Sequence, residues 1–77
     1  RTINCYPNPV AHDLEVRFES KDAHIDLYNA LGAHVYSYSE EKTGVHRIDM
    51  TKFSNGIYFL KLTEDQKSLG MVKIAKY

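Results

Sequence analysis

One apolar run constrains the fold of this chain more than any other stretch. It is residues 55–63, NGIYFLKLT, in which an Asn-Gly pair precedes aromatic and β-branched residues. Asn and Gly tolerate positive φ and are typical of turns, whereas the residues after them favour a strand. Because side chains alternate along a strand, Tyr58, Leu60 and Leu62 share one face, and the opposite face ends in Lys61. We expect the first face to lie in the core.

Six further strands are expected from the same alternation of apolar and polar residues. The seven expected strands are residues 2–6, 14–19, 24–28, 33–39, 45–49, 57–63 and 69–77. Turn signals recur about every ten residues, which is typical of sandwiches. We expect a tight turn at residues 51–54, either a single helical turn or a 3₁₀ turn, with Phe53 in the core, and a polar turn at residues 64–68. The sequence therefore predicts an all-β fold, a seven-stranded antiparallel immunoglobulin-like β-sandwich.

Length and charge narrow the possible functions. The chain has 77 residues, which predicts a single small domain that buries only about 60% of its unfolded surface. Its ten basic and ten acidic residues form no block of like charge, so we expect no nucleic-acid partner. No apolar run approaches about 20 residues, so we expect no direct membrane insertion. Because the sequence begins at Arg1 without an initiator Met, we expect a fragment of a larger protein.

Candidate metal ligands and nucleophiles are scattered along the chain. The four histidines, His12, His24, His34 and His46, form no close pair, whereas zinc sites usually contain closely spaced ligands. We therefore expect solvent-facing histidines on strands. Cys5 has no second Cys at CxxC spacing, and we expect it to be a small thiol that faces the interior. These residues predict no metal site and no catalytic nucleophile.

Carboxylate pairs, glycines and tyrosines also have structural interpretations. The pairs Glu40-Glu41 and Glu64-Asp65 fall in expected turns, where solvation is the usual role and we expect surface positions. The glycines are too scattered to cradle a phosphate. Aromatic residues on strands can form a sugar-stacking platform, but packing across strands is their more common role. The tyrosines concerned are Tyr28, Tyr36, Tyr38 and Tyr58. The residues therefore predict no enzyme and no cofactor.

A set of short motifs, taken in order along the chain, resembles one bacterial family. The motifs are Cys5-Tyr6-Pro7-Asn8-Pro9-Val10, Leu14-Glu15-Val16, residues 25–35 (IDLYNALGAHV), Ile48-Asp49-Met50-Thr51, residues 55–62 (NGIYFLKL) and Val72-Lys73-Ile74-Ala75-Lys76. This ordered set is similar to the C-terminal sorting domain of type IX (Por) secretion, type A, over nearly the whole chain. Two positions depart from the family pattern. Cys5 stands where an aliphatic residue is usual, and Ala33 where a basic or polar residue is usual.

The resemblance implies an immunoglobulin-like sandwich that serves as a secretion signal. In that family the tail is covalently linked to an N-terminal cargo domain and passes through the periplasm. It is recognised by the type IX translocon and shuttle proteins of the outer membrane, and a sortase-like cysteine protease then cleaves it off. The resemblance thus implies a cell-surface or extracellular location and a tail that is not an enzyme. The family's processing site lies before the domain, so we assign no cleavage residue.

The resemblance marks recognition motifs in the turns and in the last strand. They are Tyr6, Pro7, Asn8, Pro9, Gly32, Gly56, Tyr58, Val72, Lys73, Ile74, Ala75 and Lys76. Prolines and glycines fix turns, so Pro-Asn-Pro and Gly32 also have a purely structural interpretation. We further expect residues 69–77 to form an edge strand whose unpaired backbone groups a receptor can extend.

The alternative function is an accessory module of another class. An immunoglobulin-like adhesion or carbohydrate-binding module would use Tyr36 and Tyr38 to bind a sugar. The fold alone does not distinguish it from a sorting signal. A position at the extreme C-terminus of a secreted protein favours sorting, whereas glycan binding favours the accessory module.

Overall fold

The computed structural model describes residues 3–77. Within these residues the chain forms seven strands and one short 3₁₀ helix. In chain order they are β1 (Asn4–Tyr6), β2 (Asp13–Phe18), β3 (Ala23–Asn29), β4 (His34–Glu40), β5 (Gly44–Asp49), η1 (Met50–Lys52), β6 (Gly56–Glu64) and β7 (Lys67–Lys76). Arg1 and Thr2 lie outside the described residues, and so does the expected start of the first strand at Thr2.

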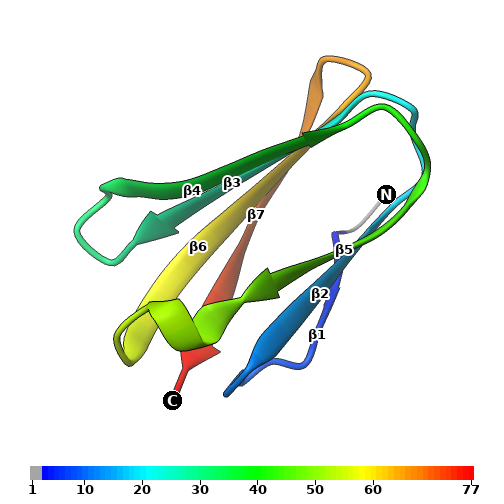
Figure 1. Ribbon diagram of the computed structural model, residues 1–77. Coiled ribbons are helices and arrows are strands. Elements are labelled where there is room, and N and C mark those ends of the chain that lie inside the picture. Colours follow the sequence, from blue (N-terminus) through cyan, green and yellow to red (C-terminus); the bar gives the residue numbers. More distant parts are fainter. Residues whose placement is uncertain (1–2) are drawn as a thin grey trace.

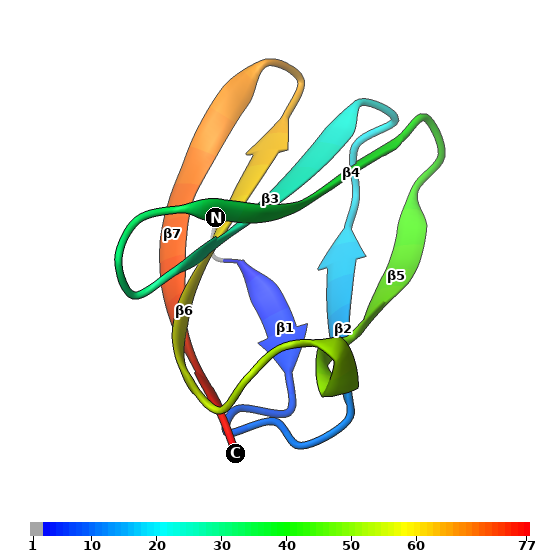
Figure 2. The same cartoon turned by 60° about the vertical axis from the view of Figure 1, so that its left-hand side comes forward.

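Two antiparallel sheets pack face to face (Figure 1). The smaller sheet has the strand order β1-β2-β5 and the larger sheet has the order β4-β3-β6-β7. The chain crosses between the sheets after β2, after β4 and again between β5 and β6, where η1 lies (Figure 2). Within the larger sheet, Leu27 of β3 faces Leu60 of β6. This arrangement confirms the predicted immunoglobulin-like β-sandwich.

The core lies between the sheets and takes alternate residues from both. Its fully buried side chains are Val10, Leu14, Val16, Ile25, Leu27, Ile48, Met50, Leu60, Leu62 and Ile74. The predicted core face of β6 is confirmed, since Tyr58, Leu60 and Leu62 are all at most 5% exposed. The hydroxyl of Tyr58 donates to the carbonyl oxygen of Ser54 at 2.7 Å, so its polar end is also satisfied. Phe53 is only half-buried and packs against this core at its margin.

The turn between β6 and β7 is tighter than the sequence predicted. It consists of Asp65 and Gln66, whose φ angles are 51° and 65°; two such residues form a type I′ hairpin turn. Glu64 therefore belongs to β6 and points inward with 4% exposure, so its expected surface position is wrong. Its Oε1 accepts hydrogen bonds from the N–H groups of Glu19 at 2.7 Å and Ser20 at 2.8 Å. This carboxylate ties the β2–β3 turn to β6.

Candidate recognition site

The segment of residues 7–10, which we call the strap, lies along the outer edge of the last strand. Asn8 contacts this edge through both polar atoms of its side chain. Its Nδ2 donates to the carbonyl oxygen of Lys73 at 2.8 Å, and its Oδ1 accepts from the N–H of Ala75 at 3.0 Å. One side-chain amide thus occupies two neighbouring backbone groups of β7.

Val10 extends the same contact with its backbone. Its N–H donates to the carbonyl oxygen of Ala75 at 2.8 Å, and its own carbonyl oxygen accepts from the N–H of Tyr77 at 3.0 Å. Val10 and Lys76 form a parallel bridge. Because β1 pairs with β2 in the smaller sheet, one N-terminal segment joins both sheets. Val10 is also a fully buried core residue, which the sequence did not predict because it lies outside every expected strand.

The residue types of the strap explain its path. Pro7 and Pro9 have no N–H and cannot continue a ladder, and both follow cis peptide bonds. Accordingly β1 ends at Tyr6, as the sequence predicted. The Asn8 side chain carries a donor and an acceptor, the same pair that a backbone residue offers. It therefore replaces the ladder pair that the prolines remove.

The strap pairs part of the edge of β7 that the sequence predicted to be open. The strand is an edge strand, as predicted, but the expected open edge at residues 69–77 is wrong for the C-terminal half. There the strap occupies groups of Lys73, Ala75 and Tyr77. In an antiparallel strand, alternate residues direct both backbone groups to the same side. The N–H of Lys73 and both groups of Met71 thus also point outward, and among residues 3–77 they have no hydrogen-bond partner on that side.

Several of the sequence motifs meet at one end of the sandwich. Gly56 faces Lys76 across β6 and β7, and Lys76 Nζ donates to the side chain of Asn55 at 2.9 Å. A shallow hollow of about 170 Å³ beside them is lined by residues 54–58 and by residues 29–31 of the β3–β4 turn. The strap and the Asn-Gly turn therefore flank the end of β7, and the β3–β4 turn lies beside the Asn-Gly turn.

The remaining recognition candidates divide between core and surface. Ile74 is fully buried and Tyr58 is 5% exposed, so both hold the sandwich together instead of presenting a surface. Val72 packs against the core, whereas Lys73 is exposed. Gly32 has a φ of 87° in the β3–β4 turn, a conformation that a side chain would strain.

Tyr6 belongs to a charged cluster on the outer face of the smaller sheet. Its hydroxyl donates to the carboxylate of Glu15, which also contacts Arg47 at 3.1 Å and Arg17 at 3.4 Å. The hydrogen bond from Tyr6 and then the charges of Arg47 and Arg17 lower the pKa of Glu15. This face therefore keeps its carboxylate ionised in mildly acidic solution.

Aromatic side chains close the opposite edge of the sandwich, between β4 and β5. His46 stacks on Tyr38 with 3.5 Å between ring centroids, and its Nε2 lies 2.5 Å from the hydroxyl of Tyr36. Phe53 lies edge-on to Tyr36 at 6.4 Å and tilted against Tyr58 at 5.8 Å. Burial lowers the pKa of His46 and raises the pKa of Tyr36. We call this row of five rings the aromatic edge.

The histidines do not converge. His12, His24 and His34 are exposed, as the sequence predicted, but His46 is half-buried in the aromatic edge, so the prediction is wrong there. Its position next to two tyrosines one strand away was not visible from spacing alone. Among residues 3–77 no group of three or more His, Cys, Asp or Glu is placed to hold a metal ion.

The tyrosines and Cys5 serve mainly in packing. Tyr36 and Tyr38 pack within the aromatic edge, in agreement with the packing interpretation. Tyr28 lies against the ring of His34 at 5.2 Å. Cys5 is half-buried against the core, where burial raises the pKa of its thiol. In the part of the chain that the structure describes, no helix has the length and apolar character needed to cross a membrane.

Comparison with known sequences identifies the family. Residues 4–76 match the family described as "Secretion system C-terminal sorting domain". The chain belongs to this family. The match runs from β1 to β7 and includes the strap, and it confirms the resemblance to the type IX sorting domain. The sorting domain is thus a non-catalytic tail that serves as a signal for export by type IX secretion.

One relative shows how much of a longer protein the sorting domain corresponds to. The sorting domain is 23% identical over 74 residues to "Ulvan lyase NLR42" of Nonlabens ulvanivorans. The aligned part is 95% of this chain but only 14% of that protein. The sorting domain therefore corresponds to a small part of the relative, and the lyase name refers to that protein.

Proposed function

We propose that the sorting domain is recognised as a folded unit, by the type IX translocon and shuttle proteins, while it passes through the periplasm. The observation that carries this proposal is the bridge from Asn8 to Lys73 and Ala75. It joins two recognition motifs that lie 65 and 67 residues apart in the chain. Residues so distant in sequence form one surface only after folding. A receptor that contacts both motifs must therefore bind the folded sandwich.

The remainder of the protein belongs to the same proposal. The sorting domain follows an N-terminal cargo domain in one chain, as the 14% share of the ulvan lyase relative suggests. After the cargo crosses the outer membrane, a sortase-like protease removes the tail, and the cargo reaches the cell surface or the medium. The cargo, and not the tail, carries any enzymatic activity.

The test of folded recognition is an export assay. A periplasmic reporter with residues 1–77 at its C-terminus is produced in a cell that has type IX secretion, and the surface and secreted reporter is measured. Leu60 is fully buried, so Leu60→Asp buries an unpaired carboxylate and should unfold the domain and abolish export. Thr43→Asp, in the exposed loop after β4, is the control and should export normally. Normal export of the unfolded Leu60→Asp tail would refute recognition of a folded unit.

Deletion of residues 70–77 tests the contribution of β7. It removes the strand that the strap contacts, and we expect export of the reporter to stop. The cleavage step is tested on the full natural protein, because the family's processing site lies before the domain. Mass spectrometry of the exported protein should show a product without residues 1–77, and an exported product that keeps them would contradict removal of the tail.

The accessory carbohydrate-binding function has less support. Its candidate residues, Tyr36 and Tyr38, are half-buried and engaged with His46. A sugar platform needs aromatic faces that are free to stack on a ligand. Binding on a glycan array that is lost in Tyr38→Ala would nevertheless restore this alternative.

A further inference from the structure

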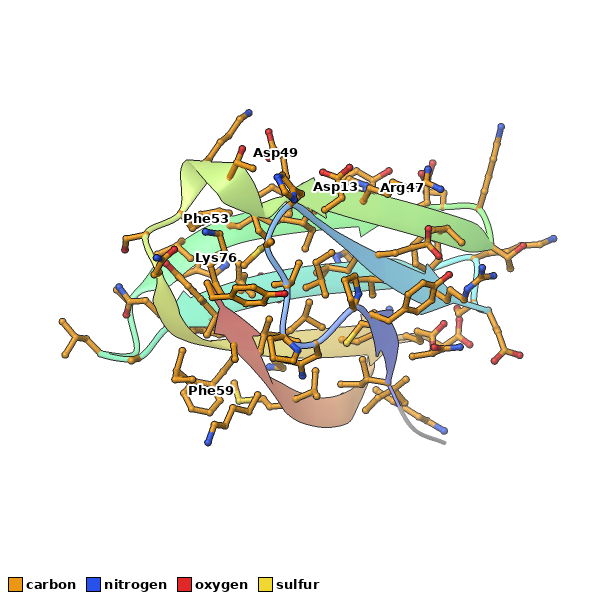
Figure 3. All side chains as sticks on the ribbon, turned by 90° about the horizontal axis from the view of Figure 1, so that it is seen from below. Asp13, Arg47, Asp49, Phe53, Phe59 and Lys76 are labelled. Carbon is orange, nitrogen blue, oxygen red and sulfur yellow. The ribbon has the colours of Figure 1, made fainter. Side chains whose placement is uncertain are left out.

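The two outer faces of the sandwich differ in chemistry. On the smaller sheet Asp13, Arg47 and Asp49 project outward, and Phe59 projects from the larger sheet on the side away from them (Figure 3). An antiparallel sheet that covers a core on one face usually offers polar residues on the other. The smaller sheet largely follows this rule, although Tyr6 and Val45 are exposed on it. The larger sheet has an exposed Met71 next to the half-buried rings of Tyr28 and Phe59.

The apolar part of the larger sheet forms a shallow depression. Its volume is about 440 Å³, and its lining comes from β3, the β3–β4 turn, β6 and β7. The lining residues are Tyr28, Asn29, Ala30, Gly32, Phe59 and Met71. Met71 is 58% exposed, although it is a large apolar residue. The depression thus extends to the edge of the sheet at β7.

Backbone groups that have no partner within residues 3–77 lie at the same place. The strap covers β7 from the carbonyl of Lys73 onward, but the N–H of Lys73 and both groups of Met71 face outward beside the depression. Unpaired backbone groups in a row bind another extended backbone, because each donor and acceptor then finds its partner. The open edge therefore fits an extended strand of another chain, and the depression fits a large apolar side chain of that strand.

We propose that this surface, the Phe59 depression with the open edge at Met71, is where a partner protein of the secretion machinery docks an extended segment. The segment adds beside β7 at Met71, and one of its large apolar side chains leans over Met71 toward Phe59. Met71 is itself the diagonal neighbour of Phe59 across β6 and β7, and long side chains reach such neighbours, so Met71 links the docked side chain to Phe59. This inference rests on the proposed function, because it names the surface through which the folded tail is recognised.

The charges around the depression select among possible occupants. Lys61 faces Met71 across β6 and β7, and Lys73 faces Phe59, so two lysines flank the apolar surface. An acidic residue in the docking segment would complement them. A second copy of the domain would instead bring the same lysines together, which is unfavourable. The favoured occupant is therefore an extended, apolar and acidic segment of another protein.

The first test changes the edge without touching the core. Met71→Glu adds an exposed carboxylate at the depression, and Met71→Pro removes the outward N–H, which β6 does not use. Each variant tail on the periplasmic reporter should lower export at least about tenfold, the effect of losing one good contact. Val45, an exposed apolar residue at 39% on the outer face of the smaller sheet, provides the control. Val45→Glu should export like the unsubstituted tail, and thermal unfolding of all three domains should match.

The second test identifies what contacts the surface. A photo-crosslinking amino acid replaces Met71 in one tail and Val45 in another, and irradiation is carried out in the exporting cell. We expect position 71 to crosslink to a protein of the translocon or shuttle, and position 45 to give no such product. The crosslink at 71 should disappear when Lys73→Pro, which removes the other outward N–H, is added.

The outcomes separate this inference from the proposed function. If the unsubstituted tail does not direct export, the proposed function fails and the inference fails with it. If that tail exports but both Met71 variants export equally well, only the docking surface is refuted. Crosslinks at 71 to a second copy of the tail or to lipopolysaccharide would likewise refute a docking segment from a partner protein.

Discussion

The two edges of this sandwich are closed by different chemistry. At the edge formed by β7, the strap supplies backbone and amide hydrogen bonds through Asn8 and Val10. At the aromatic edge, between β4 and β5, side chains stack around His46. Hydrogen bonds fix position and direction, and water can replace them when they are exposed. Stacked rings depend on buried area and tolerate small shifts, so the two edges should respond differently to substitution and to pH.

The largest effect is expected at the inner end of the aromatic edge. Tyr58→Ala removes a ring that is 5% exposed and contacts Phe53, and it should lower the free energy of unfolding by about 3 to 5 kcal/mol. Denaturant unfolding of the purified domain measures this loss. Tyr58→Phe is the matched control, because it keeps the ring and loses only the hydrogen bond to Ser54. Near-normal stability of Tyr58→Ala would show that this edge contributes little.

A smaller loss is expected at the strap. Asn8→Ala removes two exposed hydrogen bonds to β7, and water can take their place, so we expect a loss of about 1 kcal/mol. Asn8→Asp keeps the acceptor for the N–H of Ala75 but places a carboxylate beside the carbonyl of Lys73. Its stability should be no higher than that of Asn8→Ala. Denaturant unfolding together with export gives the decisive comparison. Reduced export without a loss of stability would mean that Asn8 itself is bound by the receptor.

The aromatic edge should also respond to pH. Burial places the pKa of His46 below its ordinary value, so the unfolded state takes up a proton first as the pH falls. The free energy of unfolding should therefore decrease as the pH drops through about 6.5, and level off below the folded pKa. His46→Phe should reduce this dependence between about pH 7 and pH 5, measured by thermal unfolding. If His46→Phe leaves the pH dependence of stability unchanged, ionisable groups outside the aromatic edge cause that dependence.

The smallest effect is expected beside the strap, on the outer face of β1. Tyr6→Phe removes the hydrogen bond that contributes most to the lowered pKa of Glu15. The pKa of Glu15 should rise toward its ordinary value, as an NMR titration of the carboxyl carbon would show. Because a lowered pKa stabilises the fold above the unfolded pKa and this contribution is lost in acid, the variant should be less stable than the unsubstituted domain near neutral pH, and the difference should vanish in acid. An unchanged pKa would mean that Arg47 and Arg17 set it.

Local patterns predicted the interior of this protein well. Alternation with a period of two residues requires no knowledge of distant partners, so the buried faces of β2, β3 and β6 followed directly. The position of Glu64 was missed because Asp65 and Gln66 make the turn in two residues at positive φ without a glycine. Because side chains alternate along a strand, extending β6 by one residue places the side chain of Glu64 on the inner face.

Contacts between distant segments could not be predicted in the same way. Pro-Asn-Pro was interpreted as a turn, and nothing in its neighbours indicates that Asn8 reaches residues 65 and 67 positions later. Likewise, the spacing of His46 from Tyr36 and Tyr38 gives no sign that the rings stack across two sheets. The motifs identified the family, but only the fold shows which of their residues face a partner.

The strap also determines how many N-terminal residues can be removed from this domain without exposing the edge of β7. A cut before Asn4 leaves every hydrogen bond between the strap and β7 in place. A cut after Val10 removes the whole strap, uncovers the backbone of Lys73, Ala75 and Tyr77, and lengthens the bare edge that starts at Met71. Long bare edges pair with each other and cause aggregation. If a protease releases this tail, as we propose, a cut before the strap leaves the covered half of the edge in place.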